Sequence, residues 1–273
     1  MTIKGKTVGF VGAGNMGEAL IKGLLTAGLV PPDAIFATDV RAERVSQLER
    51  QYGVRKCGDN RELVGRAEVV ILAVKPQVIP AVLREIAPGV TAHTLLVSIA
   101  AGVPTRHLRA ALPPGARLVR VMPNTAALVL EAATAIAKAE GLHEGDLETV
   151  QEIFGAVGKV VVLDEELMDA VTALSGSGPA YIALVIEALA DGGVAMGLDR
   201  GTAMTLAVQT VLGTARLLLD TGLHPAQLKD MVASPGGTTM AGVAALEEGG
   251  LRRALIGAVE RATRRSRELG RNG

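Results

Sequence analysis

The feature that most constrains the fold is the glycine-rich hexapeptide GAGNMG at residues 12–17. It directly follows the apolar run TVGFV and leads into EALIKGLLTAG, which has the pattern of a helix. Glycine at the first position permits a tight turn, and glycine at the third position lets a ligand approach the backbone. The free N–H groups at the helix start would face a phosphate. The context predicts a strand–turn–helix unit that binds a dinucleotide.

The chain then changes character near residue 164. Up to that point, short Val/Ile-rich runs alternate with amphipathic stretches, which is typical of a parallel sheet covered by helices. The runs are TVGFV, AIFAT, VVILAV, LLVSI, RLVRV, ATAIA and VVVL. Beyond it the sequence is Ala/Leu-rich and helical, with breaks at 175–179, 197–201, 221–225, 234–237 and 248–250. We expect an α/β protein: a Rossmann-like doubly wound sheet over 1–163, then an all-α substrate-binding and dimerisation domain over 164–273.

The composition limits which classes of partner are expected and indicates the cellular compartment. Lys plus Arg equals Asp plus Glu at 28 each, so no net field attracts nucleic acid. The single cysteine, Cys57, excludes an internal disulfide, and the N-terminus lacks a signal peptide's apolar core, so we expect a cytoplasmic location. No uninterrupted apolar run of about 18 residues occurs, so no membrane span is expected. No cluster of metal ligands is evident, and no metal is expected.

One stretch of the second domain is apolar almost all the way round. Residues 180–196 carry only Glu187 and Asp191 as charges. A helix of this kind needs burial on several sides, which a domain of this size can hardly provide alone. We therefore expect a homo-oligomer with this domain in the interface.

The choice between NAD and NADP is left open by the residues after the second predicted strand. Asp39 lies 22 residues after Gly17, where an acidic side chain would bond the ribose hydroxyls of NAD. Arg41 and Arg44 follow it, and their guanidinium groups would suit the 2'-phosphate of NADP.

Three further segments fall at strand ends, where doubly wound sheets bind their ligands. They are Ala73-Val74-Lys75-Pro76, the run from Ser98 to Gly102, and Met122-Pro123-Asn124. Lys75 could approach a ribose or a phosphate, although a surface lysine is the simpler alternative.

The helical half offers two glycine-rich breaks, SGSGPAY at 175–181 and SPGGTT at 234–239. Each has small residues, hydroxyls and free N–H groups at an expected helix start, which suits a carboxylate. Either break alone could be ordinary helix capping. Together they predict a shared anion pocket, provided that the fold or a dimer brings them together.

The absence of an evident proton donor narrows the substrate. Reduction of a carbonyl usually requires a donor for the developing alkoxide. No lysine lies between Lys159 and Lys229, where β-hydroxyacid dehydrogenases of similar layout carry one, and the only histidine there is His224. A protonated imine already draws hydride, so an imine substrate is favoured over a carbonyl.

In order and spacing, six motifs resemble those of the pyrroline-5-carboxylate reductase family over nearly the whole chain. They are VGFVGAGNMGEAL, AVKPQ, VSIAAGV, VMPNT, SGSGPAY and LKDMVASPGGTTMAGVAALE. The resemblance implies an oxidoreductase that reduces the cyclic imine 1-pyrroline-5-carboxylate to L-proline with NAD(P)H, the last step of proline biosynthesis. It also implies a homodimer through interlocked helical domains, often assembled into a decamer of five dimers.

The resemblance, together with the glycine-rich loop and the acidic position, gives a candidate site. The cofactor residues are Val11, Gly12, Ala13, Gly14, Asn15, Met16, Gly17, Asp39, Arg41, Asn60, Ala73, Val74, Lys75, Pro76, Ile99, Ala100, Ala101, Met122, Pro123 and Asn124. The substrate residues are Ser175, Gly176, Ser177, Gly178, Gly236, Gly237, Thr238 and Thr239. Backbone N–H groups of 236–238 would hold the carboxylate, Met122 to Asn124 would lie beside the nicotinamide, and Thr239, the catalytic candidate, would place its hydroxyl near the ring nitrogen.

Asp39 departs from the non-acidic residue that is frequent in the family, so NADPH is the expected cofactor with NADH as second. The rival interpretations are a reductase of another imine or of a hydroxy acid, a nucleotide sensor without turnover, and a structural scaffold. The missing lysine argues against the hydroxy acid, and the two glycine loops argue against the sensor and the scaffold.

Overall fold

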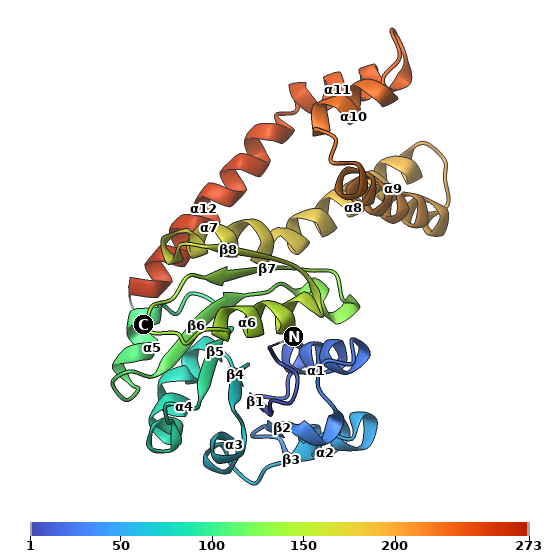
Figure 1. Cartoon of the computed structure of the whole chain (residues 1–273). Coiled ribbons are helices and arrows are strands. Elements are labelled where there is room, and N and C mark those ends of the chain that lie inside the picture. The colour runs from blue at the N-terminus through green and yellow to red at the C-terminus, as the bar shows by residue number, and fades with distance from the viewer. Residues whose placement is uncertain (1, 272–273) are drawn as a thin grey trace. The chain divides into compact units, whose positions relative to one another are not determined.

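The computed structural model describes residues 2–271, and its first half is built on one eight-stranded sheet (Figure 1). The strand order is β3-β2-β1-β4-β5-β6-β7-β8. The strands are β1 (Val8–Val11), β2 (Ile35–Thr38), β3 (Arg55–Lys56), β4 (Val69–Leu72), β5 (Leu95–Ser98), β6 (Arg117–Met122), β7 (Ala132–Ala137) and β8 (Gly158–Leu163). All seven predicted runs are strands. The two-residue β3, which is polar and exposed, was missed.

The expectation of a wholly parallel sheet is wrong at one place. β6 and β7 pair antiparallel, with Val121 opposite Ile136. Their connection is short and holds only the 3-10 turn Thr125–Val129. A parallel pair needs a crossover of about a dozen residues or more, so a connection of this length favours reversal. The remaining pairs, including β7 with β8, are parallel.

Both faces of the sheet are covered, which explains the continuous apolar runs. In β4, Val69 and Ile71 face one core while Val70 and Leu72 face the other, and all four are at most 1% exposed. Helices α1, α2 and α6 pack on the first core, and α3, α4 and α5 pack on the second. These helices are α1 (Asn15–Thr26), α2 (Ala42–Tyr52), α3 (Asn60–Arg66), α4 (Ile79–Ile86), α5 (Thr105–Ala110) and α6 (Asp146–Gly155). The doubly wound fold class is confirmed.

The chain forms two compact units whose limits differ from the predicted boundary. The first comprises Met1–Ser177 with Arg261–Gly273, and the second is Gly178–Glu260. Residues after 163 join the first unit because Met168 packs against strand β7. In addition, the Ser266 hydroxyl donates to the Asp169 carboxylate at 2.6 Å. The division at residue 164 stays a prediction.

After the sheet the chain is helical, as expected, with one correction at 175–179. This segment is not a loop. A 3-10 turn (Glu165–Leu167) leads into α7 (Met168–Val171), and a π-helical turn (Thr172–Gly176) leads directly to α8. The remaining helices are α8 (Gly178–Ala195), α9 (Arg200–Thr221), α10 (Pro225–Val232), α11 (Thr238–Glu248) and α12 (Leu251–Arg271).

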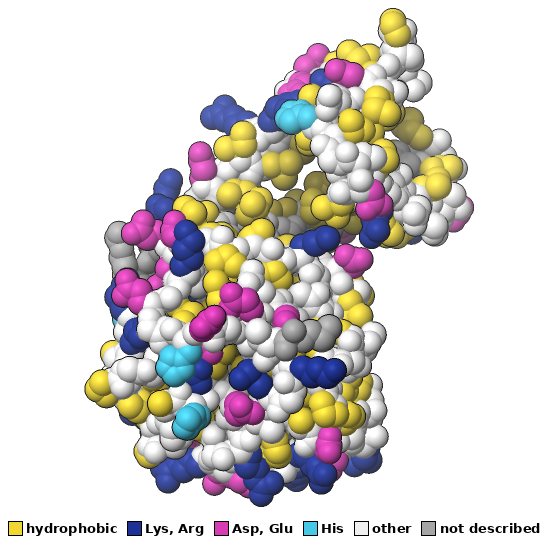
Figure 2. Space-filling model, viewed as in Figure 1, with side chains coloured by type: hydrophobic (Ala, Val, Ile, Leu, Met, Phe, Trp, Pro, Cys, Tyr) yellow, Lys and Arg dark blue, Asp and Glu magenta, His cyan; other side chains and the backbone are white. Residues whose placement is uncertain are grey.

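The second unit has little core of its own. Small residues bring α8 and α9 together, with Ala190, Ala203 and Ala207 buried between them. Large apolar side chains of both helices remain on the surface, among them Leu184 at 66% and Leu212 at 58% exposure (Figure 2). The prediction that 180–196 needs burial beyond its own domain agrees with this exposure.

Two helical stretches, Glu165–Ala195 and Arg200–Thr221, are long and apolar enough to cross a membrane by length and composition. The sequence predicts no span, because it has no uninterrupted apolar run of about 18 residues. Helices that pack against a second copy of a chain have the same composition, and the absence of a membrane partner stays a prediction.

Candidate functional site

The glycine-rich turn is packed against the ends of β1 and β4. Gly12 has φ +102°, and a Cβ on it would lie 2.6 Å from the Ala73 carbonyl oxygen. A Cβ on Gly17 would lie 2.5 Å from the Gly12 carbonyl oxygen. The Gly12 N–H donates to the Thr38 carbonyl at 2.9 Å. Only glycine fits at these two positions, as predicted.

Gly14 differs from its neighbours because nothing lies within 4 Å of where its Cβ would be. It is the N-cap of α1 and makes no side-chain capping bond. The first N–H groups of α1, those of Asn15 and Met16, have no partner within the helix. An open approach to bare N–H groups at the positive end of a helix is what a pyrophosphate requires. These residues therefore fit the expected dinucleotide.

Asp39 is placed differently from the expectation that it bonds a ribose. Its Oδ2 accepts the Ala13 N–H at 2.9 Å, and its Oδ1 accepts the Arg41 N–H at 2.9 Å. The side chain is 10% exposed. Both oxygens thus hold the turns at the ends of β1 and β2. Contact with a ribose stays a prediction for Asp39.

Arg44 does not offer a free guanidinium group to a 2'-phosphate, contrary to the sequence interpretation. Its Nε donates to the Ala13 carbonyl at 2.8 Å, and its Nη1 donates to Gln47 at 2.8 Å. Its Nη2 is paired with the Glu18 carboxylate. Arg41, whose side chain is 68% exposed, remains accessible beside the loop.

Asn60, a predicted cofactor residue, lies at the start of α3 with its amide engaged. Its Oδ1 accepts the Thr38 hydroxyl at 2.7 Å, and its Nδ2 donates to Glu85 at 2.9 Å. The side chain therefore supports the end of β2. Asp59, directly before it, caps α3 by accepting the Glu62 N–H at 2.7 Å.

The other predicted strand ends lie at the same carboxyl edge of the sheet. Lys75 follows β4, is exposed and caps the short turn Pro76–Val78. After β5, Ile99 and Ala101 are half-buried, and the Ala100 N–H donates to the Ser98 hydroxyl at 3.4 Å. Because carboxyl ends of neighbouring parallel strands meet at one edge, these segments border the glycine-rich turn. Their contact with a cofactor stays a prediction.

The predicted nicotinamide segment touches one predicted substrate segment. The Asn124 Nδ2 donates to the Ser175 carbonyl at 3.1 Å, and its Oδ1 accepts the Ala133 N–H at 3.2 Å. A Cβ on Gly176 would lie 2.6 Å from the Met122 Cε. The end of the Met122 side chain therefore packs directly on Gly176, and the structure brings these two predicted parts of the site together.

Free N–H groups at a helix start were expected around Ser175 to Gly178, and this expectation is wrong. The Ser177 N–H donates to the Thr172 carbonyl at 2.9 Å within the π-helical turn. The Ser175 hydroxyl donates to the Val171 carbonyl at 3.2 Å. The turn therefore offers a closely packed wall, and its N–H groups are not a receptor for an anion.

The second substrate segment belongs to the other compact unit. Gly236 has φ +67°, a conformation that favours glycine, and Gly237 caps α11 without a side-chain bond. The Gly237 N–H is already used, because it donates to the Ser234 carbonyl at 3.0 Å. The Thr239 hydroxyl donates to the Val232 carbonyl at 3.3 Å. The helix start at Thr238 is the part of this loop that can receive an anion.

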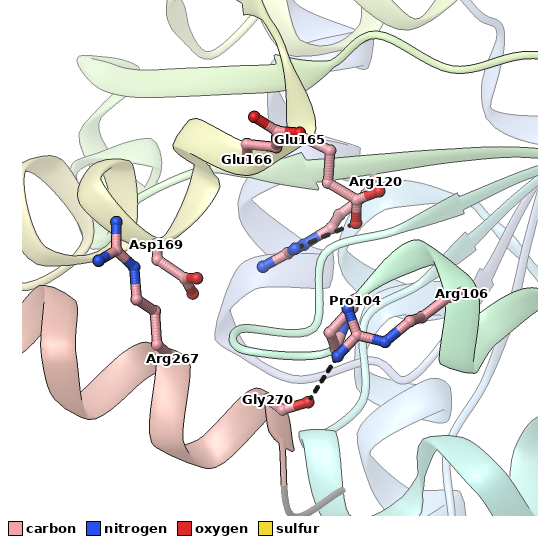
Figure 3. A pocket seen from close by; sticks show the side chains of 8 residues that line it. All are labelled: Pro104, Arg106, Arg120, Glu165, Glu166, Asp169, Arg267 and Gly270. Atoms are coloured by element: carbon pink, nitrogen blue, oxygen red, sulfur yellow. Dashed lines mark hydrogen bonds and ion pairs between the residues drawn. The ribbon is translucent and has the colours of Figure 1, made fainter.

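A polar cavity of about 260 Å³, distinct from the predicted site residues, lies at the end of α12 (Figure 3). Arg120 is buried there and donates to Glu165 at 3.2 Å, and the Thr105 N–H donates to the same carboxylate at 2.6 Å. Burial would raise the pKa of Glu165, but the bonds from Thr105 and Arg120 outweigh it and lower that pKa. The lining residues are Pro104, Arg106, Arg120, Glu165, Glu166, Asp169, Arg267 and Gly270.

Sequence reasoning missed several supporting residues. Glu18, which pairs with Arg44 and accepts the Tyr52 hydroxyl at 3.1 Å, had only its place in the first turn of α1 as a signal. Thr38 and Glu85 hold the Asn60 side chain, but no sequence signal pointed to them, because these partners are far from Asn60 in sequence.

Among residues 2–271, no three His, Cys, Asp or Glu side chains are grouped as a metal site would require. That metals take no part stays a prediction.

Topology and loop together define the class: a Rossmann-type dinucleotide-binding protein with a helical second unit. Comparisons with known proteins agree. The family model described as "Pyrroline-5-carboxylate reductase dimerisation" matches residues 165–269. A model described as "NADP oxidoreductase coenzyme F420-dependent" matches residues 7–102.

Named relatives match over the whole length. The pyrroline-5-carboxylate reductase of Methanosarcina acetivorans is 51% identical over 98% of this chain and 100% of its own. That of Synechocystis is 49% identical over 97% and 98%. A solved pyrroline-5-carboxylate reductase from Coxiella burnetii superposes with a TM-score of 0.92 at 37% identity, covering 97% of this chain and 98% of its own. The corresponding Plasmodium falciparum enzyme, solved with NADP bound, gives 0.88 at 32% identity over 98% and 99%. The chain belongs to the pyrroline-5-carboxylate reductase family.

Proposed function

We propose that this protein reduces 1-pyrroline-5-carboxylate to L-proline with NADPH, the last step of proline biosynthesis. The observation that carries the proposal is the full-length likeness at 51% identity to an enzyme of that name. The open cradle at Gly14 supports dinucleotide binding. NADPH supplies the hydride, and the chain's own residues bind and orient the two reactants. NADH is the second candidate cofactor.

For the substrate carboxylate we propose the start of α11 as the receptor. Gly237 caps this helix without a side-chain bond, so the N–H groups of its first turn, beginning at Thr238, can meet an anion. Gly236 leaves the backbone bare on this approach, because nothing lies within 4 Å of where its Cβ would be. Ser175 and Gly176, packed against Asn124 and Met122, form the wall near the reacting centre.

For Thr239 the hydrogen bond to Val232 suggests a specific role. Because its hydroxyl proton is directed at the Val232 carbonyl, the oxygen is left as an acceptor. A protonated imine nitrogen is a donor and would complement it. Thr239 then holds the ring nitrogen in its charged form, which draws hydride to the adjacent carbon. No strong general acid is needed for this step.

The test is the loss of reduced-nicotinamide absorbance with 1-pyrroline-5-carboxylate, run with NADPH and NADH in parallel and followed by quantification of L-proline. The wild-type chain is expected to oxidise NADPH and form L-proline in equal amounts. Thr239→Val, which removes the acceptor while keeping the shape, should lower turnover by about a hundredfold with unchanged cofactor affinity. Cofactor binding without any oxidation would overturn the proposed reaction, and normal turnover of the variant would remove Thr239 from it.

The dimerisation model over 165–269 supports self-association of this chain. We propose a homodimer formed through the helical unit and assembled further into a decamer of five dimers. We also propose a cytoplasmic location, which the buried, unpaired thiol of Cys57 supports.

A further inference from the structure

One residue of the glycine-rich loop, Ala13, is held from both sides by side chains of the neighbouring strand–helix unit. Its N–H donates to Asp39 at 2.9 Å, and its carbonyl accepts from the Arg44 Nε at 2.8 Å. Ala13 lies between the two glycines that shape the phosphate cradle. A loop whose peptide groups are fixed on both sides keeps its following N–H groups in place before a ligand arrives.

The Arg44 side chain is held in place by the protein through all three of its nitrogens. Each of its three nitrogens has a protein partner: the Ala13 carbonyl, Gln47 and Glu18. The Arg44 side chain is only 16% exposed. Three of its five N–H donors are used in these bonds, which hold the guanidinium group in place against the loop.

The network continues beyond Arg44 and ties α1 to α2. Glu18 accepts the Tyr52 hydroxyl at 3.1 Å, and Gln51 donates to that hydroxyl at 2.9 Å. Burial and the hydrogen bond to Glu18 raise the pKa of Tyr52, so the phenol stays a donor at neutral pH. The Arg44 position is therefore set from several directions.

Arg41, unlike Arg44, is exposed and is held by few contacts. Its side chain is 68% exposed, and its Nε lies 3.5 Å from the Asp39 Oδ1. Both Asp39 oxygens accept backbone N–H groups, those of Ala13 and Arg41, and the Arg41 guanidinium lies beside this carboxylate. The two arginines that follow the second strand thus differ in what they can do.

We infer that Arg44 is a positioning residue that holds the pyrophosphate loop through Ala13 and serves NADPH and NADH equally, while discrimination between the two falls to Arg41. This inference rests on the proposed function for the identity of the cofactor. It gives Arg44 a role on the loop that its place in the sequence, three residues after Arg41, does not suggest.

The experiment measures dissociation constants of NADPH and NADH by calorimetry, without substrate, for three matched variants on the full chain. Arg44→Met should weaken both cofactors by about tenfold, or about 1.4 kcal/mol, and leave their ratio within twofold. Arg41→Met should weaken NADPH by about tenfold and NADH by less than twofold. Arg50→Met, an exposed position on the same helix, should change neither constant.

Two further readings separate the possible outcomes. If Arg44→Met fails to fold, Glu18→Gln takes its place, because it keeps the bond to Ala13 but removes the charge partner; it should weaken both cofactors by one common, smaller factor. A selective loss of NADPH binding in either variant would overturn the inference. Wild-type protein that binds neither cofactor would instead overturn the proposed function, so the two failures are distinguishable.

Discussion

Glycines in one short loop are required for different reasons, and the difference is visible atom by atom. Gly12 and Gly17 have no room for a side chain because neighbouring backbone oxygens lie within 2.6 Å of the Cβ position. Gly14 has open space around it and an ordinary φ of −70°. Gly12 and Gly17 therefore shape the loop. At Gly14 the protein itself leaves room for a side chain, and we expect the cofactor to approach there.

This distinction gives a prediction for paired variants. Gly14→Ala should leave the melting temperature unchanged, because the methyl group meets nothing in the protein, yet raise the NADPH dissociation constant by at least about tenfold. Gly17→Ala should lower the melting temperature, because its Cβ would overlap the Gly12 carbonyl oxygen. Calorimetry and thermal denaturation of both variants test this, and equal melting temperatures for the pair would contradict it.

Sequence reasoning predicted which residues lie at turns and strand ends better than it predicted the hydrogen-bond partners of those residues. The spacing of Asp39 after Gly17 predicted its place beside the loop, but not that its carboxylate would be spent on Ala13 and Arg41. The bare backbone at Gly236 was foreseen, whereas the bond of the Gly237 N–H to Ser234 was not. Such bonds depend on the local turn geometry, which residue types alone do not determine.

At the level of elements, periodicity predicted the strands with continuous apolar runs. It missed the two-residue strand β3 and the reversed direction of β7. All seven apolar runs are strands, because strands buried on two faces need uninterrupted apolar residues. The direction of β7 depends on the length of its connection, and the π-helical turn at Thr172–Gly176 keeps glycines inside a helix where they suggested a loop. Neither the direction of β7 nor the helical state of this turn can be predicted from the composition of the element itself.

One carboxylate joins three elements of the first unit and makes stability depend on pH. Glu165 accepts from the Thr105 N–H at the start of α5. It also accepts from Arg120 in β6 (Figure 3). Its pKa is lowered in the folded state, so its contribution is present above the ordinary value of about 4.3 and is lost as pH falls through the folded value.

Glu165→Gln should therefore reduce the free energy of unfolding by about 1–2 kcal/mol at neutral pH, where the buried Arg120 loses its charged partner. The side chain of Glu165 is 34% exposed, which keeps the effect at the lower end. The difference should shrink as the pH falls below about 4.3, the ordinary value for a glutamate. Urea denaturation over a series of pH values measures it, with Glu166→Gln, which lines the same cavity, as the control; a pH-independent difference would refute the assignment.

For the whole molecule, the exposed apolar surface of α8 and α9 calls for a second copy. Leu184 and Leu212 are more than half exposed, although each would be worth about 1.5–3 kcal/mol if buried. The match to a dimerisation model covers both residues.

Leu184→Glu should therefore shift the protein towards the monomer, with a dimer dissociation constant raised by at least about a hundredfold, because a buried carboxylate without a partner is costly. Analytical ultracentrifugation over a range of concentrations measures this. Val161→Glu, the same kind of change at an exposed position in β8 of the first unit, is the control for the dimer. An unchanged dimer in the Leu184 variant would place the interface elsewhere.

The helical unit, Gly178–Glu260, is an insertion within the first unit, because Arg261–Gly273 returns to it. There Ser266 bonds Asp169, and the Arg106 side chain reaches the Gly270 carbonyl at 3.4 Å. Removing residues from the C-terminus would therefore destabilise the first unit, which contains the nucleotide-binding sheet. The helical unit, although it lies directly before these residues in sequence, would be less affected. The helical half also has two covalent tethers, so a single proteolytic cut between the units would nick the protein without releasing either piece.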